Sequence, residues 1–596
     1  MKRKGLKCIA AAMAVTMGIT VAGCQKESSP ASSQTDEQKT EETVQAGETA
    51  QAAQAAQDES GGDLADEENL YGYSQPVSIK FGFSYGSDFK YREGESAVSN
   101  PWNDLYQANG INVDVLYEVD GTQAVTKFNN AVASGTYPDV FSAGATDLKT
   151  YAKTGVIADI TEVYEKYASD ELKEYINSDG GMGLSSAMVD GRLYGIPKMG
   201  NGYDNVMMMF VRQDWLDKLN LKMPETMDEL VETAKAFTEM DPDGNGKADT
   251  YGLGFNGKNV FDMVGGIQAF FEGYGAAPGY WNGQFTFIEK EGKVLWGGNL
   301  PEEMKEGLTV LQQMYKDGSI PKDFGVMDSN ALTEDLSAGR CGIFFAPMWG
   351  AMGPSANAVK NDIDAHFTAA PIPDGNGEGS SKAYFASSVD NAYYTVSSKC
   401  SNPEVLIKLM NLSVQKLCHP KDEDEFKKYY VDNGYQVWKY SLTQTTPPLK
   451  NYDNWKKESK AVETGNTDGL NTEQMSDYTN MKAYLDAMAG GSPDLDAPAF
   501  QAGIGLYTVF GDPVGGYAAI DKMIQEDAFN KSVYNTVPTE TMAAKYPTLN
   551  KMAMETIVKI ISGDSVEDYD AFLETWNKLG GEDVTKEAQS WYDSQK

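Results

Sequence analysis

The spacing of apolar residues predicts alternating strands and helices along most of the chain. Residues 77–83 and 111–119 alternate apolar and polar positions, which is the period of a half-buried strand, and Asn100 predicts a helix start between them. A strand, a helix and a second strand in this order are typical of an α/β fold. Gly135 and Pro138 then predict the end of a helix and the start of a third strand.

The run at residues 206–212 is almost continuously apolar, which predicts a strand buried on both faces of a mostly parallel sheet. After it, Thr226 predicts a helix N-terminus, because its hydroxyl can accept a free backbone amide while Glu229 reaches back at capping-box spacing. The apolar residues that follow share one face of this helix: Met227, Leu230, Val231, Ala234 and Phe237.

Later segments continue the alternation and become helical toward the end of the chain. Residues 285–296 predict a hairpin, residues 301–317 a long amphipathic helix, and residues 338–349 a strand that runs into a loop. Two further amphipathic helices are predicted at residues 547–563 and 565–579, and a glycine pair ends the second.

The chain length and charge limit the possible classes of protein. A chain of 596 residues is too long for one ordinary core, so two lobes are expected. Lys and Arg total 50 against 87 Asp and Glu, and the resulting net charge of −37 argues against nucleic-acid binding. This charge favours solubility, with attraction of cationic ligands as the alternative.

The N-terminus has the organisation of a secretion signal. Basic residues precede an apolar stretch at residues 9–21, and the small residues Val21-Ala22-Gly23 lead to Cys24. This ending resembles the bacterial lipobox, which implies removal of residues 1–23 and acylation of Cys24, with palmitate among the acyl chains. A transmembrane helix is the alternative, but it needs roughly 20 apolar residues. Residues 24–75 predict a disordered acidic tether, because they are poor in apolar side chains.

The remaining cysteines and the histidines offer little for zinc or nucleophile chemistry. Cys341, Cys400 and Cys418 have no metal-type spacing, and His366 and His419 are the only histidines. Zinc sites and histidine-based triads are therefore not expected. The thiols are expected to be buried and unreactive, with a disulfide left open.

An acidic loop places oxygen-bearing groups two or four residues apart around glycines, the spacing of a calcium-binding loop. The expected ligands are the side chains of Asp241, Asp243, Asn245 and Asp249 and the carbonyl of Lys247. Thr250 and Gly252 stand where a glutamate ligand would complete such a loop. We predict a structural calcium ion here, with a metal-free polar turn as the alternative.

Several motifs resemble, in their order, those of the extracellular solute-binding proteins of bacterial ABC importers. The narrower resemblance is to the large, lipid-anchored, oligosaccharide-binding group that includes the alginate-binding proteins. The motifs are Tyr194-Gly-Ile-Pro197, the strand at 206–212, Asp214-Trp-Leu-Asp-Lys-Leu219, Pro224-x-Thr226-x-x-Glu229 and the acidic loop. Residues 128–140 and 338–349 resemble two further elements of the wider family.

The resemblance implies an α/β, two-lobed periplasmic-binding-protein-like fold of type II, with a hinge and an interlobe ligand cleft. The implied N-terminal lobe comprises residues 76–200 and about 382–440, and the C-terminal lobe about 201–381 and 441–596. Glycines flank the polar residues near 200–205, which suits a hinge that absorbs backbone rotation.

Aromatic faces that stack on sugar rings and planar polar groups that bind hydroxyls define the candidate ligand residues. Trp349 matches a sugar-stacking tryptophan of the wider family. The others lie on a glycine-flanked loop, at the implied hinge or in the first lobe, and each could instead be a core residue. The candidates are Trp349, Trp281, Tyr280, Tyr203, Asp204 and Trp102.

The sequence therefore predicts a substrate-binding lipoprotein of an ABC importer on the outer face of the membrane of a Gram-positive bacterium. As a monomer it would close on an oligosaccharide and deliver it to a membrane permease. No local motif positions catalytic carboxylates or a nucleophile, so no enzymatic activity is expected. The alternatives are an anchored glycan-degrading enzyme, a surface adhesin, and a binding protein for a peptide or other non-sugar solute.

Overall fold

The structure, a computed structural model, describes residues 69–594 apart from short gaps. The predicted signal peptide, Cys24 and most of the predicted tether lie outside the described residues. All the described residues belong to one compact unit, Glu59–Lys596. The gaps are residues 86–88, 179–180, 201, 280–284, 376–378, 386–388, 433–434, 448, 492 and 535–537.

The first hydrophobic core begins with the predicted strand–helix–strand unit. β1 (Val77–Tyr85) and β2 (Ile111–Asp120) pair in parallel, and α1 (Pro101–Ala108) lies between them in the chain. The Asn100 side chain accepts the backbone N–H of Asn103 at 3.0 Å, so it caps α1 as the sequence predicts.

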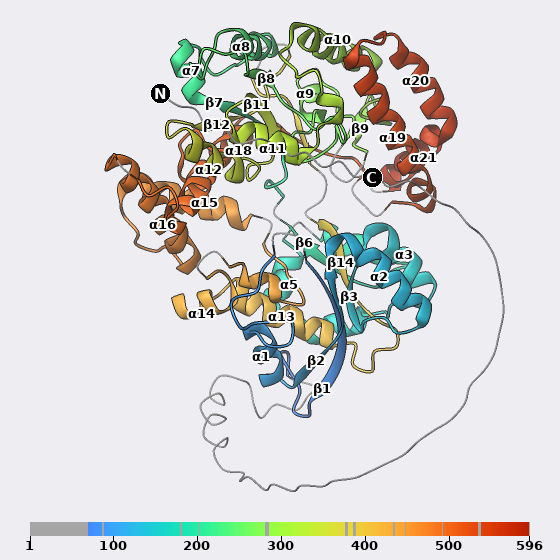
Figure 1. Ribbon diagram of the computed structural model, residues 1–596. Coiled ribbons are helices and arrows are strands. Elements are labelled where there is room, and N and C mark those ends of the chain that lie inside the picture. The colour runs from blue at the N-terminus through green and yellow to red at the C-terminus, as the bar shows by residue number, and fades with distance from the viewer. Residues whose placement is uncertain are drawn as a thin grey trace, which may run out of the picture. The chain divides into compact units, whose positions relative to one another are not determined.

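A second sheet of this core contains a strand from much later in the chain. β14 (Val389–Val396) lies between β3 (Val140–Gly144) and β6 (Ile196–Met199) and is antiparallel to both. In Figure 1, α2 and α3 lie on one side of these strands, and α5 and α13 on the other. The elements around this core are α2 (Gly121–Ser134), α3 (Ala145–Lys153), α4 (Thr161–Tyr167), α5 (Asp170–Ile176), α6 (Met182–Ser186), β4 (Met188–Val189), β5 (Arg192–Leu193), α13 (Val405–Leu417), α14 (Glu423–Tyr429) and η3 (Val437–Tyr440).

The second core is built on a four-stranded sheet with the order β12 (Phe367–Ala370), β7 (Met208–Arg212), β11 (Cys341–Ala346), β8 (Tyr251–Leu253). Every residue of β7 is buried, as predicted. The expectation of parallel neighbours is wrong, because β7 is antiparallel to both β11 and β12. The apolar run reflects burial on both faces of the sheet, which antiparallel strands also experience when both faces are covered.

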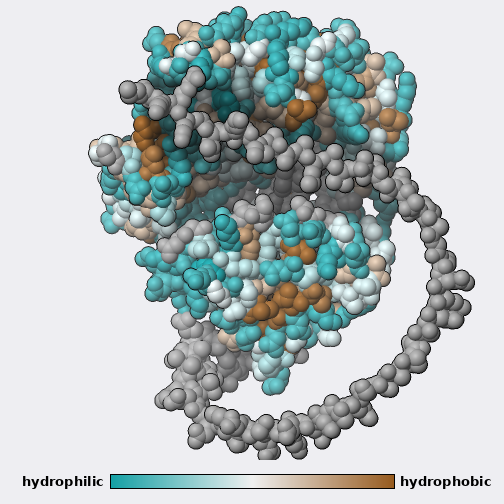
Figure 2. All heavy atoms as spheres, viewed as in Figure 1, coloured by the Kyte–Doolittle hydropathy of each residue, from teal (hydrophilic) through white to brown (hydrophobic). Residues whose placement is uncertain are grey.

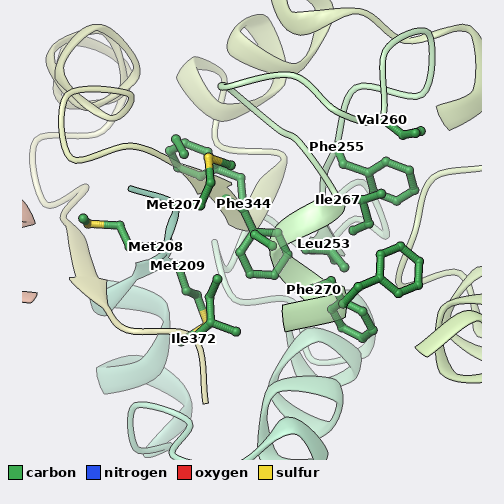
Figure 3. Close-up of a cluster of buried hydrophobic side chains, with 14 of the residues drawn as sticks. Met207, Met208, Met209, Leu253, Phe255, Val260, Ile267, Phe270, Phe344 and Ile372 are labelled. Atoms are coloured by element: carbon green, nitrogen blue, oxygen red, sulfur yellow. The ribbon is translucent and has the colours of Figure 1, made fainter. Parts of the chain in front are cut away.

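Apolar side chains from the sheet and its loops fill this core. In Figure 3, methionines of the β7 region and Phe344 of β11 lie together with aromatic and aliphatic side chains from residues 253–270. Burial of this many apolar side chains is the main stabilising contribution to such a core.

One helix and one hairpin of the second core form where the sequence predicts them. Thr226 caps α8 (Met227–Glu239) by accepting the N–H of Glu229, while the Glu229 carboxylate accepts the N–H of Glu225. The predicted hairpin is present as β9 (Phe287–Lys290) and β10 (Lys293–Trp296). The other elements are α7 (Gln213–Leu219), α9 (Gln268–Glu272), α10 (Pro301–Asp317), η2 (Phe324–Val326), α11 (Ser329–Ser337), α12 (Met352–Asn361), α19 (Glu540–Ser562), α20 (Asp568–Trp576), η5 (Asn577–Gly581) and α21 (Glu582–Ser594).

The chain passes between the two cores three times. Up to Met199, and again from Val389 to Leu442, the buried apolar residues belong to the first core. Between these two stretches and after Leu442, they belong mainly to the second core. The last passage leads into a helical region of α15 (Lys450–Thr464), α16 (Thr472–Ala489), α17 (Pro498–Leu506), η4 (Tyr507–Gly511) and α18 (Gly516–Gln525). β13 (Ala383–Phe385) pairs in parallel with β15 (Phe529–Lys531).

The end of the predicted tether is attached to the first core. Lys408 of α13 donates to the Gly72 carbonyl at 2.6 Å, and Asn411 donates to the Leu70 carbonyl at 2.7 Å. The Tyr73 hydroxyl donates to Glu404 at 3.0 Å. Residues 70–73 are therefore part of the folded structure, although the sequence predicts a tether through residue 75.

The surface is consistent with the acidic composition. The face seen in Figure 2 is mainly hydrophilic, with small separate apolar patches. Within the described part of the chain, no helix has both the length and the apolar character needed to cross a membrane.

Candidate functional site

A pocket of about 290 Å³ lies where the chain passes between the two cores. This volume is close to the lower end of the range for small-ligand sites. Many of the lining residues belong to the passages themselves: Gly200, Asp204, Asn205, Gln444, Thr445, Thr446, Lys450 and Asn451. β6, α13, the end of α14, η3 and the loop after β11 contribute the rest: Lys198, Met199, Leu417, Tyr430, Trp438 and Trp349.

The carboxylate of Asp204 joins three segments at the pocket wall. Asn451, at the start of α15, donates its amide to Asp204 Oδ2 at 2.7 Å, and the Tyr517 hydroxyl of α18 donates to Oδ1. Burial raises the pKa of Tyr517 well above its usual value, and the Asp204 charge raises it further. Asp204 therefore fixes the first passage between the cores to the helical region that follows the third.

An ion pair forms the adjacent part of the wall. The Lys450 ammonium lies 2.5 Å from Glu473 Oε1 of α16, and the Tyr430 hydroxyl donates to the same oxygen at 2.9 Å. Asn454 donates to Glu473 Oε2 at 3.2 Å. Burial opposes the charge on Lys450, but Glu473 and Tyr430 raise its pKa well above the usual value. The charge that Lys450 brings to the pocket is thus balanced within the protein.

Two more carboxyl groups lie behind this ion pair. Glu458 of α15 has 0% exposed surface, and neither carboxyl oxygen has a hydrogen-bond partner among the described residues. Burial, followed by the charges of Asp477 and Glu473, raises its pKa to about 9. Burial and Glu473 raise the pKa of Asp477 to about 8. Burial and the neighbouring negative charge thus favour the protonated form of both groups.

The rest of the lining combines aromatic rings with neutral polar groups. Trp349, Trp438 and Tyr430 supply rings, and Asn205, Asn451 and Gln444 supply amides. Thr445 is 2% exposed, and its hydroxyl has no hydrogen-bond partner in the described part of the chain. Rings for stacking and amides or hydroxyls for directional bonds are the groups that recognise uncharged polyols.

The structure brings together two of the predicted ligand residues. Trp349 and Asp204 both line the pocket. Tyr203 is next in sequence, but its ring packs against Phe529 and Tyr452, with centroids 5.0 and 5.9 Å away. Tyr280 and Trp281 lie outside the described residues.

Trp102 requires a correction. Its side chain has 0% exposed surface, and the indole N–H donates to the Tyr429 carbonyl at 3.1 Å. The ring also packs edge-on against that of Tyr429. Trp102 is therefore a core residue in this structure and is not among the residues that line the pocket.

Sequence reasoning missed most of the pocket. Trp438, the polar segment Gln444–Thr446 and the Lys450–Glu473 pair lie outside the motifs that carry the family resemblance. The available signal was a tryptophan followed by a Gln-Thr-Thr run immediately before a helix, which places an aromatic ring and three polar side chains at one turn.

The acidic loop after α8 folds around its own side chains. Asn245 donates its amide to Asp243 at 2.5 Å and to Asp249 at 3.1 Å, and the Gly246 N–H donates to Asp241 at 3.1 Å. Thr250 donates its hydroxyl to the Phe237 carbonyl and is therefore directed at α8. The carboxylates of the loop lie close together as a result.

The donor set of this loop fits a calcium ion. Asp241 Oδ1 is buried and has no hydrogen-bond partner among the described residues. Burial raises the pKa of Asp243, and the neighbouring carboxylates of Asp241 and Asp249 raise it further. A bound cation would give the buried Asp241 oxygen a partner and would reduce the repulsion between the carboxylates. In the described residues, however, no group of three His, Cys, Asp or Glu side chains has the arrangement of a preformed metal site.

Comparison with known proteins gives one family and several relatives. The family described as bacterial extracellular solute-binding protein matches residues 103–416, more than half of the chain. The polygalacturonan/rhamnogalacturonan-binding protein YtcQ of Bacillus subtilis is 29% identical over 249 residues, 40% of this chain and 44% of the relative. The fructooligosaccharide ABC transporter substrate-binding protein FusA of Streptococcus pneumoniae is 28% identical over 255 residues, 40% of this chain and 45% of the relative. The chain thus matches less than half the length of these curated relatives.

Solved structures are similar over nearly the whole described chain. S. pneumoniae FusA in complex with kestose has a TM-score of 0.59 at 18% identity, covering 87% of this chain and 99% of FusA. A FusA EF-hand mutant with fructo-nystose has a TM-score of 0.57 at 17% identity, covering 87% and 99% of the two chains. The alginate-binding protein AlgQ2 without calcium ion has a TM-score of 0.58 at 16% identity, covering 88% and 100%. These similarities establish the predicted periplasmic-binding-protein-like fold.

Proposed function

Because the chain belongs to the bacterial extracellular solute-binding protein family, we propose that it captures an oligosaccharide for an ABC importer. The pocket between the cores would be the binding site, and a membrane permease would receive the bound sugar. The curated relatives whose names state a ligand bind carbohydrates, including fructooligosaccharides and polygalacturonan, which supports this class of ligand.

The observation that carries the proposal is the composition of the pocket. Trp349 and Trp438 come from different cores and line one cavity together with amide and hydroxyl side chains. Sugar rings offer an apolar C–H face for stacking and hydroxyls for hydrogen bonds to planar polar groups. The pocket lining contains both aromatic rings for stacking and polar side chains for hydrogen bonds.

Binding at this place can control the relative orientation of the cores. The lining residues Asp204, Gln444 and Lys450 belong to passages of the chain between the cores, so contacts with a ligand act directly on the connecting segments. A ligand shifts such an equilibrium by its difference in affinity for the two orientations. Hinge closure around the sugar would then produce the state that the permease recognises.

The proposal includes a structural calcium ion in the acidic loop. Asp241, Asp243, Asn245 and Asp249 would supply side-chain oxygens, with the Lys247 carbonyl as a further ligand. The unpartnered Asp241 oxygen and the mutual repulsion of the carboxylates support this assignment. The ion would stabilise the loop after α8 and take no part in sugar capture.

The proposal also includes attachment to the outer face of the membrane through lipidated Cys24, with the mature protein acting as a monomer. The lipobox-like sequence before Cys24 supports this attachment. Palmitate labelling of cells producing the wild type and Cys24→Ala tests it, because only the wild type should be labelled and recovered with membranes. Light scattering of the soluble domain tests the oligomeric state.

A thermal-shift screen of the soluble domain against defined oligosaccharides tests the main proposal. A ligand that binds the folded state raises Tm by mass action. Trp349→Ala and Trp438→Ala should abolish the shift, whereas Trp591→Ala, outside the pocket, should retain it. No shift with any carbohydrate, while a peptide or another solute produces one, would overturn the sugar assignment.

The same experiment separates binding from catalysis. The family and the relatives are solute-binding proteins, so the sugar should be recovered intact after prolonged incubation. Chromatography showing cleaved glycan would favour the anchored glycan-degrading enzyme instead. Binding restricted to long polymers would favour an adhesin.

A further inference from the structure

We infer that the pocket selects neutral oligosaccharides and rejects glycans that carry carboxylates, such as uronates. This inference rests on the proposed function and specifies its ligand class. Among the relatives, FusA is named for a neutral sugar and YtcQ for an acidic one, so their names leave the choice open. The charged groups at the pocket wall are paired within the protein, and this pairing favours a neutral ligand.

The Lys450 ammonium is not available to an acidic ligand. Glu473 lies 2.5 Å from it, and this carboxylate is held by further donors from Tyr430 and Asn454. A uronate would have to displace Glu473, which would leave a largely buried carboxylate without its counter-ion. Breaking a buried pair in this way is costly, and the compensated pair offers no net charge to an incoming anion.

The surroundings of the pair also disfavour another negative charge. Burial raises the pKa of Glu458 and of Asp477, and neighbouring carboxylates raise both further, so this region already disfavours additional negative charge. An anion entering the adjoining pocket would be partly desolvated and would face Glu473 as well. The net charge of the chain, −37, adds repulsion at longer range.

The adjacent part of the wall carries a fixed carboxylate. Asp204 lines the pocket and accepts hydrogen bonds from Asn451 and Tyr517. The remaining cation of the lining, Lys198, is already engaged within the protein. In the described lining, Asp204 thus opposes a ligand carboxylate, and the ammonium of Lys450 is neutralised by Glu473.

The neutral groups of the lining suit hydroxyls. The buried Thr445 hydroxyl lacks a partner among the described residues, and a sugar hydroxyl can donate to it and accept from it. Asn205 and Gln444 add amides that bond in both directions. Leaving such a buried hydroxyl without a partner costs free energy, so a ligand that satisfies it gains affinity.

Three probes with defined charge test the inference by isothermal titration calorimetry: kestose, trigalacturonate and fully methyl-esterified trigalacturonate. The last two share one sugar backbone and differ in the methyl esters that remove the charge of the carboxylates. A panel of other neutral and acidic oligosaccharides accompanies them. We expect every bound glycan to be neutral, with affinities that change less than twofold between 50 and 500 mM NaCl, since ionic screening affects charged ligands most.

The outcomes are distinct. Any acidic glycan that binds more tightly than its neutral form, with affinity that falls as salt rises, overturns the inference and leaves the proposed function intact. Absence of binding to every carbohydrate overturns both.

A variant pair tests the role of the hydroxyl. Thr445→Val preserves shape and should weaken binding of a neutral glycan about tenfold, which corresponds to loss of one hydrogen bond to a buried group. Thr575→Val, on an exposed face of α20, should leave the affinity unchanged. Equal affinities for the wild type and Thr445→Val would overturn the assignment of Thr445 as a ligand contact.

Discussion

The Lys450 ammonium lies 2.5 Å from the Glu473 carboxylate, and both side chains are largely removed from solvent beside the pocket. The two residues belong to successive helices, α15 and α16, so the ion pair joins the helical region to the pocket wall. A pair in this position stabilises one arrangement of the two helices, because either charge alone would be buried without compensation.

Lys450→Met should destabilise the protein by about 3 kcal/mol, because it leaves the Glu473 charge buried without a partner. The double variant Lys450→Met/Glu473→Gln should recover most of this loss. Urea unfolding of the two variants and the wild type measures both values. Equal stability of the single and double variants would show that the two charges are not coupled.

Glu458→Gln should stabilise the protein at alkaline pH. The folded-state pKa of about 9 lies above the usual value of 4.5. Stability from this group is therefore fully present below about pH 4.5 and is lost as pH rises toward 9, by about 1.4 kcal/mol per pH unit. The variant should unfold with a flatter pH dependence between pH 6 and 9. Glu463→Gln, exposed on the same helix, should behave as the wild type.

Tyr517→Phe should weaken both folding and ligand capture. The substitution removes one donor from the Asp204 carboxylate, and loss of a bond to a buried charged group costs about 1.5–3 kcal/mol. Because Asp204 lines the pocket, oligosaccharide affinity should fall with stability. Denaturant unfolding and calorimetry measure the two effects, and Tyr435→Phe, at an exposed position, serves as the control.

Calcium should raise Tm of the wild type by a few degrees, and chelation should reverse the change, because the ion binds the folded loop alone. Asp243→Asn should remove the response, whereas Asp468→Asn, in an exposed loop, should keep it. An identical response in the wild type and Asp243→Asn would show that calcium binds elsewhere or not at all.

Elements with local signals were predictable from the sequence. Gly135 ends α2 with φ +71°, a backbone conformation that glycine adopts without strain, and the helix predicted at residues 301–317 has those bounds in the structure. α19 was predicted to start at Pro547 but starts at Glu540, capped by Thr539. The cap and the buried apolar stripe of this helix outweigh the cost of an internal proline.

The pocket could be predicted only in part, because its residues meet through contacts between distant segments. Trp349 was accessible through its match to a sugar-stacking tryptophan of the wider family, and Asp204 through its place at the implied hinge. Trp438 and Thr445 have only the weak signal of a tryptophan and a Gln-Thr-Thr run before a helix, and the Lys450–Glu473 pair has no local pattern that distinguishes it from charges on a solvated helix. Their role depends on which helices pack together, which periodicity does not specify.

The bond from Tyr517 to Asp204 joins residues 313 positions apart. Contacts across such long segments carry a large loop-closure cost, so they form after local structure during folding. During synthesis, Asp204 emerges from the ribosome long before α18. The helices α19, α20 and α21, which also pack in the second core, are made later still. A chain that ends before α18 therefore lacks the Tyr517 donor that holds Asp204, so this part of the pocket wall takes its final form only after most of the chain has been made and exported.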